Sequence, residues 1–212
     1  MSTPARIAVL DYGIGNLRSA EKALAHLGAD AVLTADPDTV ASAAAVVLPG
    51  VGAFGRCMEE LRAHGLDTPA LDAATSGRPF LGICVGMQML FESSTESPGV
   101  PGLGVVPGVV ERLHGPVTIP HMGWNTVDAV PRSGLFAGVP EPRWCYFVHS
   151  YSAVPTDPAV VSATTDHGGT LVAAVEAGAV WATQFHPEKS GACGLAVLAN
   201  FVAAAAQHAE SG

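Results

Sequence analysis

The chain has 212 residues, of which 49% are hydrophobic and 14% are charged, and its formal net charge is −9. A chain of this length and hydrophobicity can bury a sizeable core, so we expect a globular protein with a single domain over residues 1–212. The acidic balance and the lack of any Lys/Arg cluster argue against nucleic acid or an anionic membrane surface as a partner.

From the sequence we expect no signal peptide, no membrane-spanning segment and no metal site. Charges, prolines or glycines interrupt every apolar stretch, so we expect none to be long enough to span a bilayer. The N-terminal residues lead directly into an apparent strand, without the features of a signal peptide. Because the cysteines lie far apart and form no CxxC pair, neither a zinc site nor a disulfide framework is expected. We therefore expect a cytoplasmic protein with reduced thiols, which are Cys57, Cys84, Cys145 and Cys193.

The first half of the chain alternates strand-like and helix-like segments. Short apolar runs predict strands at 6–12, 31–36, 44–50 and 79–84. Between them we expect a helix that Asn16 caps and Gly28 ends, a weak helical stretch before residue 44, and helices near 55–64 and 69–76. Strands that are apolar on both faces and alternate with helices predict a parallel sheet covered on both sides.

The pattern changes near residue 97, where proline and glycine become too frequent for a helix. Val-rich runs broken by turns predict shorter, largely antiparallel strands at 117–127, 144–154, 160–166, 171–178 and 180–186. A closing helix is expected at 194–208. The predicted fold class is therefore α/β, with an open, mixed, mostly parallel sheet, helices on both faces and smaller antiparallel strands in the C-terminal half.

The segment PFLGICVGMQ (79–88) places Cys84 between two glycines at alternate positions. Gly-x-nucleophile-x-Gly is the pattern of a nucleophile elbow, a strained strand-to-helix turn that exposes the reactive side chain. A helix beginning at Val85 would direct its N–H groups at the thiol and stabilise anions there. The Val85 N–H would be a natural oxyanion donor. From this motif alone, a small buried structural thiol remains the alternative.

A candidate base lies at the end of the expected strand at 180–186. His186 is followed by the rigid Pro187 and by Glu188, which is close enough in sequence to hold the imidazole in one tautomer. Glu188 could instead be a surface carboxylate paired with Lys189. Spacing alone does not show that Cys84 and His186 meet, but a parallel sheet could bring both strand ends to one edge.

Three motifs in order, LPGVGAFG, GICVGMQ and QFHPEKS, resemble those of the class I (triad) glutamine amidotransferases. DYGIGN, IPHMGWN and YFVHSY make the chain similar, within that class, to the glutaminase subunits of imidazole glycerol phosphate synthase, in histidine biosynthesis. The resemblance runs from about residue 6 to 202 and implies a single class I glutamine amidotransferase domain.

The resemblance implies that Cys84 attacks the side-chain amide of glutamine, with His186 as general base and then general acid and Glu188 orienting His186. Ammonia leaves, and water hydrolyses the glutamyl thioester to glutamate. One oxyanion donor would be Val85, and the second would be Val51 or Gly52 in the PGVG loop at 49–52. The resemblance implies that this loop can hold the wrong peptide orientation until the partner is loaded. The implied substrate-binding residues are Gly50, Gly52, Gln88, Glu96, Ser150 and Tyr151.

The family pairs this subunit with a (β/α)₈-barrel cyclase that receives the ammonia, and no metal or cofactor is implied. The implied docking face comprises Asn16, Met122, Trp124, Tyr146 and Lys189. By composition alone, Met122 and Trp124 are as readily core residues. Other functions stay open: an amidotransferase of another pathway, a cysteine peptidase or DJ-1-like protein sharing the elbow, or a non-catalytic binding module. GIGNLR is too weak a motif to predict dinucleotide binding.

Overall fold

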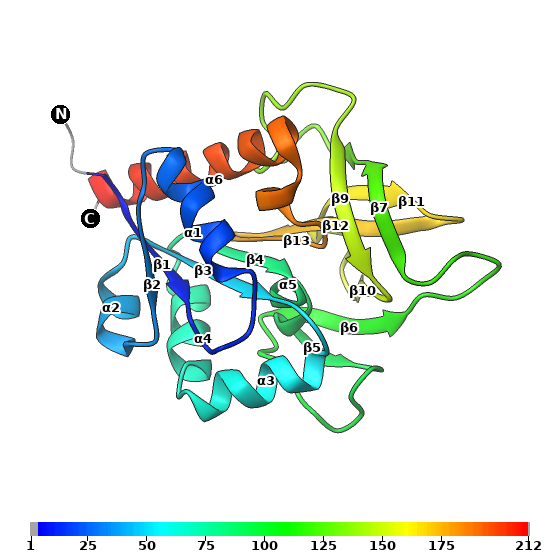
Figure 1. Cartoon of the computed structure of the whole chain (residues 1–212), viewed down its shortest axis with the longest axis horizontal. Helices are drawn as coiled ribbons and strands as arrows, with labels where there is room; N and C mark the ends of the chain where they lie inside the picture. The colour runs from blue at the N-terminus through cyan, green and yellow to red at the C-terminus, as the bar shows by residue number, and fades with distance from the viewer. Residues whose placement is uncertain (1–3, 212) are drawn as a thin grey trace.

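The computed structural model describes residues 4–211. Residues 1–3 and 212 of the predicted domain lie outside the described range. An eight-stranded sheet crosses the molecule in the order β2-β1-β3-β4-β13-β12-β11-β8 (Figure 1). The first five of these strands are parallel, and the last three continue antiparallel. The strands are β1 (Arg6–Leu10), β2 (Asp30–Thr34), β3 (Ala45–Gly50), β4 (Phe80–Cys84), β8 (Asp128–Ala129), β11 (Val161–Asp166), β12 (Thr170–Ala177) and β13 (Val180–Thr183).

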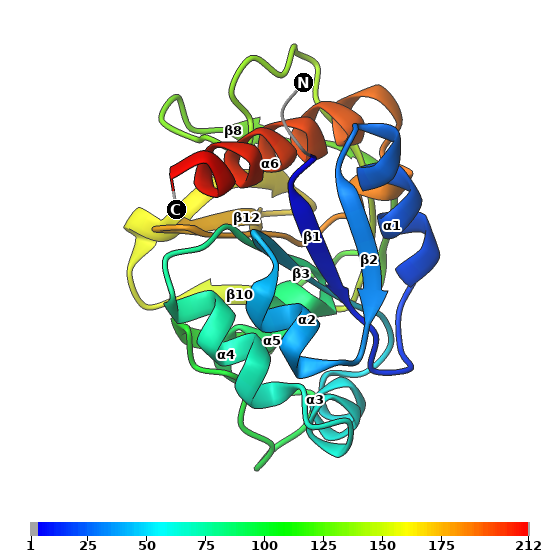
Figure 2. The ribbon, with the colours of Figure 1, turned by 90° about the vertical axis from the view of Figure 1, so that its left-hand side faces the viewer.

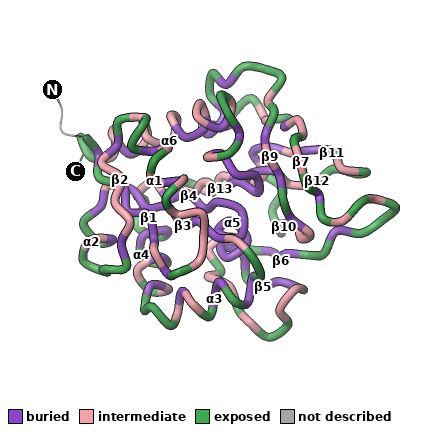
Figure 3. The backbone as a smooth tube through the Cα atoms, in the orientation of Figure 1, coloured by how far each residue is buried: buried purple, intermediate pink, exposed green. Residues whose placement is uncertain are grey.

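Helices cover both faces of this sheet, as the uniformly apolar strands predict. Every residue of β3 and β4 is buried, because neither face is open to solvent (Figure 3). Helices α1 (Leu17–His26) and α6 (Gly191–Ser211) lie on one side, and α2 (Pro37–Ser42), α3 (Phe54–Ala63) and α4 (Asp67–Thr75) lie on the other (Figure 2). The predicted fold class is confirmed.

Two smaller sheets flank the carboxyl edge of the parallel strands. One has the order β10-β6-β5, formed by β10 (Tyr151–Pro155), β6 (Val106–Arg112) and β5 (Phe91–Ser94). The other pairs β7 (His121–Thr126) with β9 (Trp144–His149). The run expected as one strand at 144–154 is therefore two strands, which separate at Ser150 and enter different sheets. Two short 3₁₀ turns, Pro158–Val160 and Pro187–Lys189, complete the fold.

Two local expectations need correction. The helix expected after Cys84 is only α5 (Val85–Met89), and the chain then enters β5. The strand expected to reach His186 ends at Thr183, whose hydroxyl donates to the carbonyl of Phe185 and turns the chain off the sheet. Because α5 is so short, its dipole contributes less at Cys84 than a long helix would.

The C-terminal helix α6 is longer than expected. By length and composition it could cross a membrane, so the expectation that no stretch is long enough was wrong. This test is weak evidence for a span, because a helix that packs into a core also passes it. One side of α6 contributes Val197, Leu198 and Phe201 to the hydrophobic core.

Candidate active site

Cys84 stands at a strained turn between β4 and α5. Its φ of 56° is the only positive φ of a non-glycine residue within residues 4–211. The neighbouring glycines are required by packing: a Cβ on Gly86 would lie 1.8 Å from the Leu48 carbonyl oxygen, and one on Gly82 would lie 3.0 Å from the Gly86 oxygen. The Gly-x-Cys-x-Gly pattern therefore reflects two close approaches, of β3 to Gly86 and of the α5 segment to Gly82.

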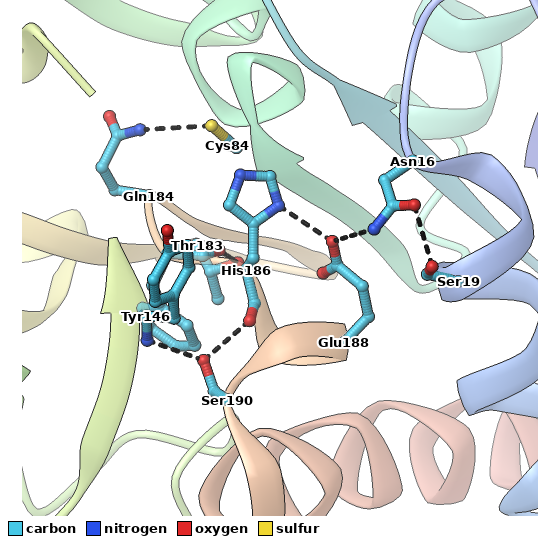
Figure 4. Close-up of polar contacts among 10 residues, drawn as sticks. Asn16, Ser19, Cys84, Tyr146, Thr183, Gln184, His186, Glu188 and Ser190 are labelled. Atoms are coloured by element: carbon cyan, nitrogen blue, oxygen red, sulfur yellow. Dashed lines mark hydrogen bonds and ion pairs between the residues drawn. The ribbon is translucent and has the colours of Figure 1, made fainter. Parts of the chain in front are cut away.

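His186 and Glu188 lie beside this turn because β13 is the parallel neighbour of β4. The His186 ring points toward the Cys84 thiol, and its Nδ1 lies 2.9 Å from the Glu188 carboxylate (Figure 4). Both side chains are only 2% exposed, so Glu188 is not the surface carboxylate considered above. The structure thus brings together the three residues that the sequence could not connect.

Asn16 extends this arrangement. It occupies the N-cap position of α1, but its side chain makes no capping bond to the helix. Instead its Oδ1 accepts from the Ser19 hydroxyl at 2.8 Å, and its Nδ2 makes a long 3.5 Å contact with the Glu188 carboxylate (Figure 4). A residue predicted at the docking face therefore touches the carboxylate that holds His186.

The surroundings of His186 favour its charged form. Burial alone lowers the pKa of His186, but hydrogen bonds to Cys84 and Glu188 outweigh burial and raise that pKa to about 9. At neutral pH the imidazole is therefore protonated when it faces the cysteine sulfur. A protonated imidazole beside a sulfur nucleophile supplies both a counter-charge and a proton for a leaving group.

Two side chains hold the loop at 49–52 from below. The Tyr12 hydroxyl donates to the carbonyl of Pro49, and the Cys57 thiol donates to the carbonyl of Val51 at 3.3 Å. Burial raises the pKa of Cys57 to about 11, so this side chain remains a protonated donor. The two contacts fix the peptides on either side of the Gly50–Val51 bond. Sequence reasoning missed both side chains: Tyr12 lies in the DYGIGN motif, but nothing in the sequence places either residue against the 49–52 loop.

A cavity of about 620 Å³ opens above Cys84. Most of the predicted site residues line it together, namely Asn16, Val51, Gly52, Cys84, Val85, Gln88, Glu96, Ser150, Tyr151, His186 and Lys189. Gly50 lies behind this wall, where a Cβ would come within 2.7 Å of the Gly86 nitrogen. Its position is explained by backbone packing.

Two of the lining side chains are already engaged within the protein. The Gln88 amide donates to the Tyr151 carbonyl at 3.2 Å and to Gln184 Oε1 at 3.0 Å. One Glu96 carboxylate oxygen accepts from the backbone N–H of Phe54 at 2.8 Å, at the start of α3. Glu96 therefore ties the cavity wall to the segment that follows the 49–52 loop.

Gln184 is a site residue that sequence reasoning missed. It is fully buried, and its Nε2 lies 3.9 Å from the Cys84 sulfur (Figure 4). Its position two residues before His186 was the available signal, since alternate residues of an extended segment face the same side.

A cluster of three histidines lies beside the cavity, which one of them, His149, lines. His149 Nε2 lies 3.0 Å from His121 Nδ1, and the other His149 nitrogen contacts the Tyr151 carbonyl at 2.8 Å. His167 stacks on His121. Burial and the neighbouring histidines lower the pKa of both His121 and His149 to about 4, so both are neutral at physiological pH.

An apolar face continues outward from the cavity on the β7–β9 pair. Cross-strand pairing sets Met122 opposite Val148 and Trp124 opposite Tyr146, and Trp144 follows two pairs further along, on the same face. Met122 is 65% exposed and Trp124 is 54% exposed, so neither is a core residue. We call this set, Met122, Trp124, Trp144, Tyr146 and Val148, the apolar face. The sequence missed Trp144 and Val148, which alternation along β9 could have indicated.

Comparison with known proteins agrees with this geometry. A family model for class I glutamine amidotransferases matches residues 8–205. A crystal structure of a glutamine amidotransferase superposes with a TM-score of 0.75 at 22% identity, covering 94% of this chain and 98% of the other. PurLQS from Thermotoga maritima gives a TM-score of 0.72 at 19% identity, covering 95% and 98%. These two likenesses show the shared fold.

Curated relatives narrow the class. Imidazole glycerol phosphate synthase subunit HisH from Thermobifida fusca is 51% identical over 208 residues, covering 93% of this chain and 98% of the relative. HisH from Methanothermobacter thermautotrophicus is 52% identical over 196 residues, covering 92% and 97%. The chain therefore belongs to the HisH family of class I glutamine amidotransferases, and the resemblance carried by its motifs is confirmed.

Proposed function

We propose that this protein hydrolyses glutamine to glutamate and ammonia through a thioester on Cys84, and passes the ammonia to the cyclase subunit of imidazole glycerol phosphate synthase. One observation carries the proposal: a strained Cys84 faces His186, which Glu188 holds at 2.9 Å, at the floor of a cavity of about 620 Å³. The assignment to imidazole glycerol phosphate synthase is supported by the names of the HisH relatives.

The chemistry divides between two steps that share one base. The Cys84 sulfur attacks the amide carbon of glutamine while His186 holds the thiol proton, and His186 then delivers a proton to the departing ammonia. Neutral His186 next removes a proton from water, which attacks the thioester and releases glutamate. Glu188 keeps the imidazole in the tautomer that both steps need.

The developing oxyanion would be stabilised by the Val85 N–H and by an N–H of Val51 or Gly52. The loop at 49–52 acts as the switch in this proposal. Tyr12 and Cys57 bind the carbonyls on either side of the Gly50–Val51 peptide, so any rotation of that peptide works against two fixed neighbours. A signal from the partner would reorient the loop and complete the hole.

Glutamine would bind with its α-amino group near Glu96 and its backbone against Ser150 and Tyr151. The free oxygen of the Glu96 carboxylate is available for this, since the structure gives its other oxygen to Phe54. Gln88 would position Tyr151, because its side-chain amide donates a 3.2 Å hydrogen bond to the Tyr151 carbonyl. Gly52 lines the same cavity, whereas Gly50 supports the wall from behind.

The partner would be a (β/α)₈-barrel cyclase that docks on the apolar face and around Asn16 and Lys189. The face is exposed, aromatic and continuous with the cavity through Val148, which suits an interface that encloses a volatile intermediate. We place the protein in the cytoplasm as a single domain that works without a cofactor.

The test is a glutaminase assay on the free subunit, on its complex with the cyclase, and on the complex with the cyclase ligand bound. We expect hydrolysis to rise at each stage, and Cys84→Ala to abolish it while the complex still makes its imidazole product from added ammonia. Substantial hydrolysis by Cys84→Ala, or no hydrolysis in the liganded complex, would contradict the proposal.

A further inference from the structure

Two thiols that the proposed chemistry does not use touch each other beneath the apolar face. Cys145 lies on β9 and Cys193 in the first turn of α6, and their sulfur atoms are 3.6 Å apart. Cys145 is fully buried because it alternates along β9 with the outward Trp144 and Tyr146, whereas Cys193 is partly exposed. The two residues come from segments that only the fold brings together.

We propose that Cys145 and Cys193 form a reversible disulfide, with hydrogen peroxide or another hydroperoxide as the oxidant. The sulfurs need to approach from 3.6 Å to about 2.05 Å, which requires a small shift of the α6 start toward β9. A single reversible bond of this kind differs from a structural disulfide framework and is typical of redox sensing in reducing compartments.

The environment assigns different roles to the two thiols. The hydrogen bond between the two thiols lowers the pKa of Cys193, burial opposes this, and the charge of Arg143 lowers the pKa further. The same bond and burial both raise the pKa of Cys145. Cys193 is thus the more acidic and the more accessible sulfur, which makes it the site of first oxidation.

The reaction balances in two steps. The Cys193 thiolate attacks one peroxide oxygen, the O–O bond breaks, and the departing hydroxide takes a proton to give water and a sulfenic acid on Cys193. The Cys145 sulfur then attacks the Cys193 sulfur, its proton leaves with the sulfenic hydroxyl as water, and the S–S bond forms. Two thiols are oxidised, and one peroxide is reduced to two waters.

The bond would join the two segments that carry the candidate active site and its docking face. The Tyr146 N–H donates to the Ser190 hydroxyl at 2.9 Å, that hydroxyl donates to the His186 carbonyl at 2.7 Å, and the His186 N–H donates to the Tyr146 carbonyl at 3.0 Å (Figure 4). Cys145 directly precedes Tyr146, and Cys193 follows Ser190 by one helical turn. A covalent tie here restrains the His186–Ser190 segment against β9.

Trypsin offers a direct test, because each cysteine falls in a different tryptic peptide. Cys145 lies in residues 144–189 and Cys193 lies in residues 190–212. Full-length Cys84→Ala protein is treated with hydrogen peroxide, alkylated, digested without reductant and analysed by mass spectrometry. We expect these two peptides to appear linked and to separate with dithiothreitol, and the treated protein to melt several degrees higher than its reduced form. Cys193→Ser, which changes a partly exposed thiol, is the control and should show neither effect.

Oxidation of Cys193 to a sulfinic acid without a link, a link between two chains, or two thiols that stay alkylatable would each overturn the proposal. None of these measurements depends on glutaminase activity, so they remain decisive if the proposed function fails. In the wild-type complex, oxidation should lower the partner-stimulated rate several-fold more than in Cys193→Ser, and dithiothreitol should restore the difference. An equal loss in both proteins would contradict the restraint of the His186–Ser190 segment.

Discussion

The thiol of Cys57 donates a hydrogen bond to the carbonyl oxygen of Val51, at 3.3 Å, beneath the loop that borders the candidate oxyanion site. Removing this donor should weaken the resting arrangement of the loop by about 1 kcal/mol, the net worth of a typical hydrogen bond. We expect Cys57→Ala to raise the glutaminase rate of the free subunit about fivefold and to reduce its stimulation by the cyclase. Cys57→Ser retains a donor and should behave like the wild type. A rate in Cys57→Ala equal to or below that of wild type would contradict a resting role for this bond.

His186 and Glu188 should differ in their importance. Without His186 no side chain accepts the thiol proton or protonates the leaving ammonia, so His186→Ala should lower kcat by about 10²–10⁴-fold. Glu188→Gln keeps the shape of its side chain and loses only the charge that orients the ring, so its effect should lie near the lower end of that range. Steady-state kinetics on the liganded complex provides the measurement. Small and equal losses in both variants would mean that the base lies elsewhere.

The apolar face should contribute to partner affinity through its central aromatic residue. Trp124 is 54% exposed and contacts the ring of Tyr146 edge-on, at a centroid distance of 6.0 Å. Buried tryptophans dominate the energetics of interfaces, so Trp124→Ala should weaken cyclase binding at least tenfold. Val154→Ala removes another exposed hydrophobic residue, 47% exposed and located on β10, and should leave the affinity unchanged. Equal effects of the two variants in a titration would place the interface elsewhere.

Acid should destabilise the protein through the histidine cluster. The pKa values of His121 and His149 are lowered to about 4, so between pH 6.5 and 4 the unfolded chain binds protons that the folded protein does not. The free energy of unfolding therefore has its full value from these histidines above pH 6.5 and decreases as the pH drops. His149 accounts for at most about 1.4 kcal/mol of this decrease per pH unit. His186, whose pKa is raised, is protonated in both states below pH 6.5 and adds no slope there.

Urea unfolding of wild type and His149→Gln from pH 4.5 to 7 measures this contribution. The variant should show a shallower loss of stability toward acid pH, even if it is less stable overall. Parallel curves for the two proteins would show that His149 is not held neutral by the fold.

The sequence predicts the parallel half of the fold and the elbow because these follow from local patterns. Doubly apolar strands require cover on both faces, and Gly82 and Gly86 are needed wherever a turn meets a neighbouring backbone. Prediction from the sequence fails where tertiary contacts decide the structure. The run at 144–154 divides into two strands because its halves pair with different sheets. Helix α5 is short because the chain pairs as β5 directly after it.

The same distinction applies to the candidate site. Motifs indicate Cys84, His186 and Glu188. The structure places Cys84 and His186 in one cavity and Glu188 buried against His186, and their roles stay predictions. Tyr12 and Cys57 act through contacts across the fold that no local spacing reveals, whereas the two-residue spacing of Gln184 from His186 was an available signal. Trp144 and Val148 belong to the apolar face only once the register of β7 against β9 is known.

The central claim is that glutamine becomes bound covalently to Cys84. Complex loaded with glutamine, or with an electrophilic diazoketone analogue of glutamine, is quenched in acid, digested and examined by mass spectrometry. We predict a glutamyl adduct on the peptide that contains Cys84, lost in Cys84→Ala and absent from the peptides of Cys57, Cys145 and Cys193. Continued hydrolysis with no adduct on Cys84, or an adduct on another cysteine, would contradict the account.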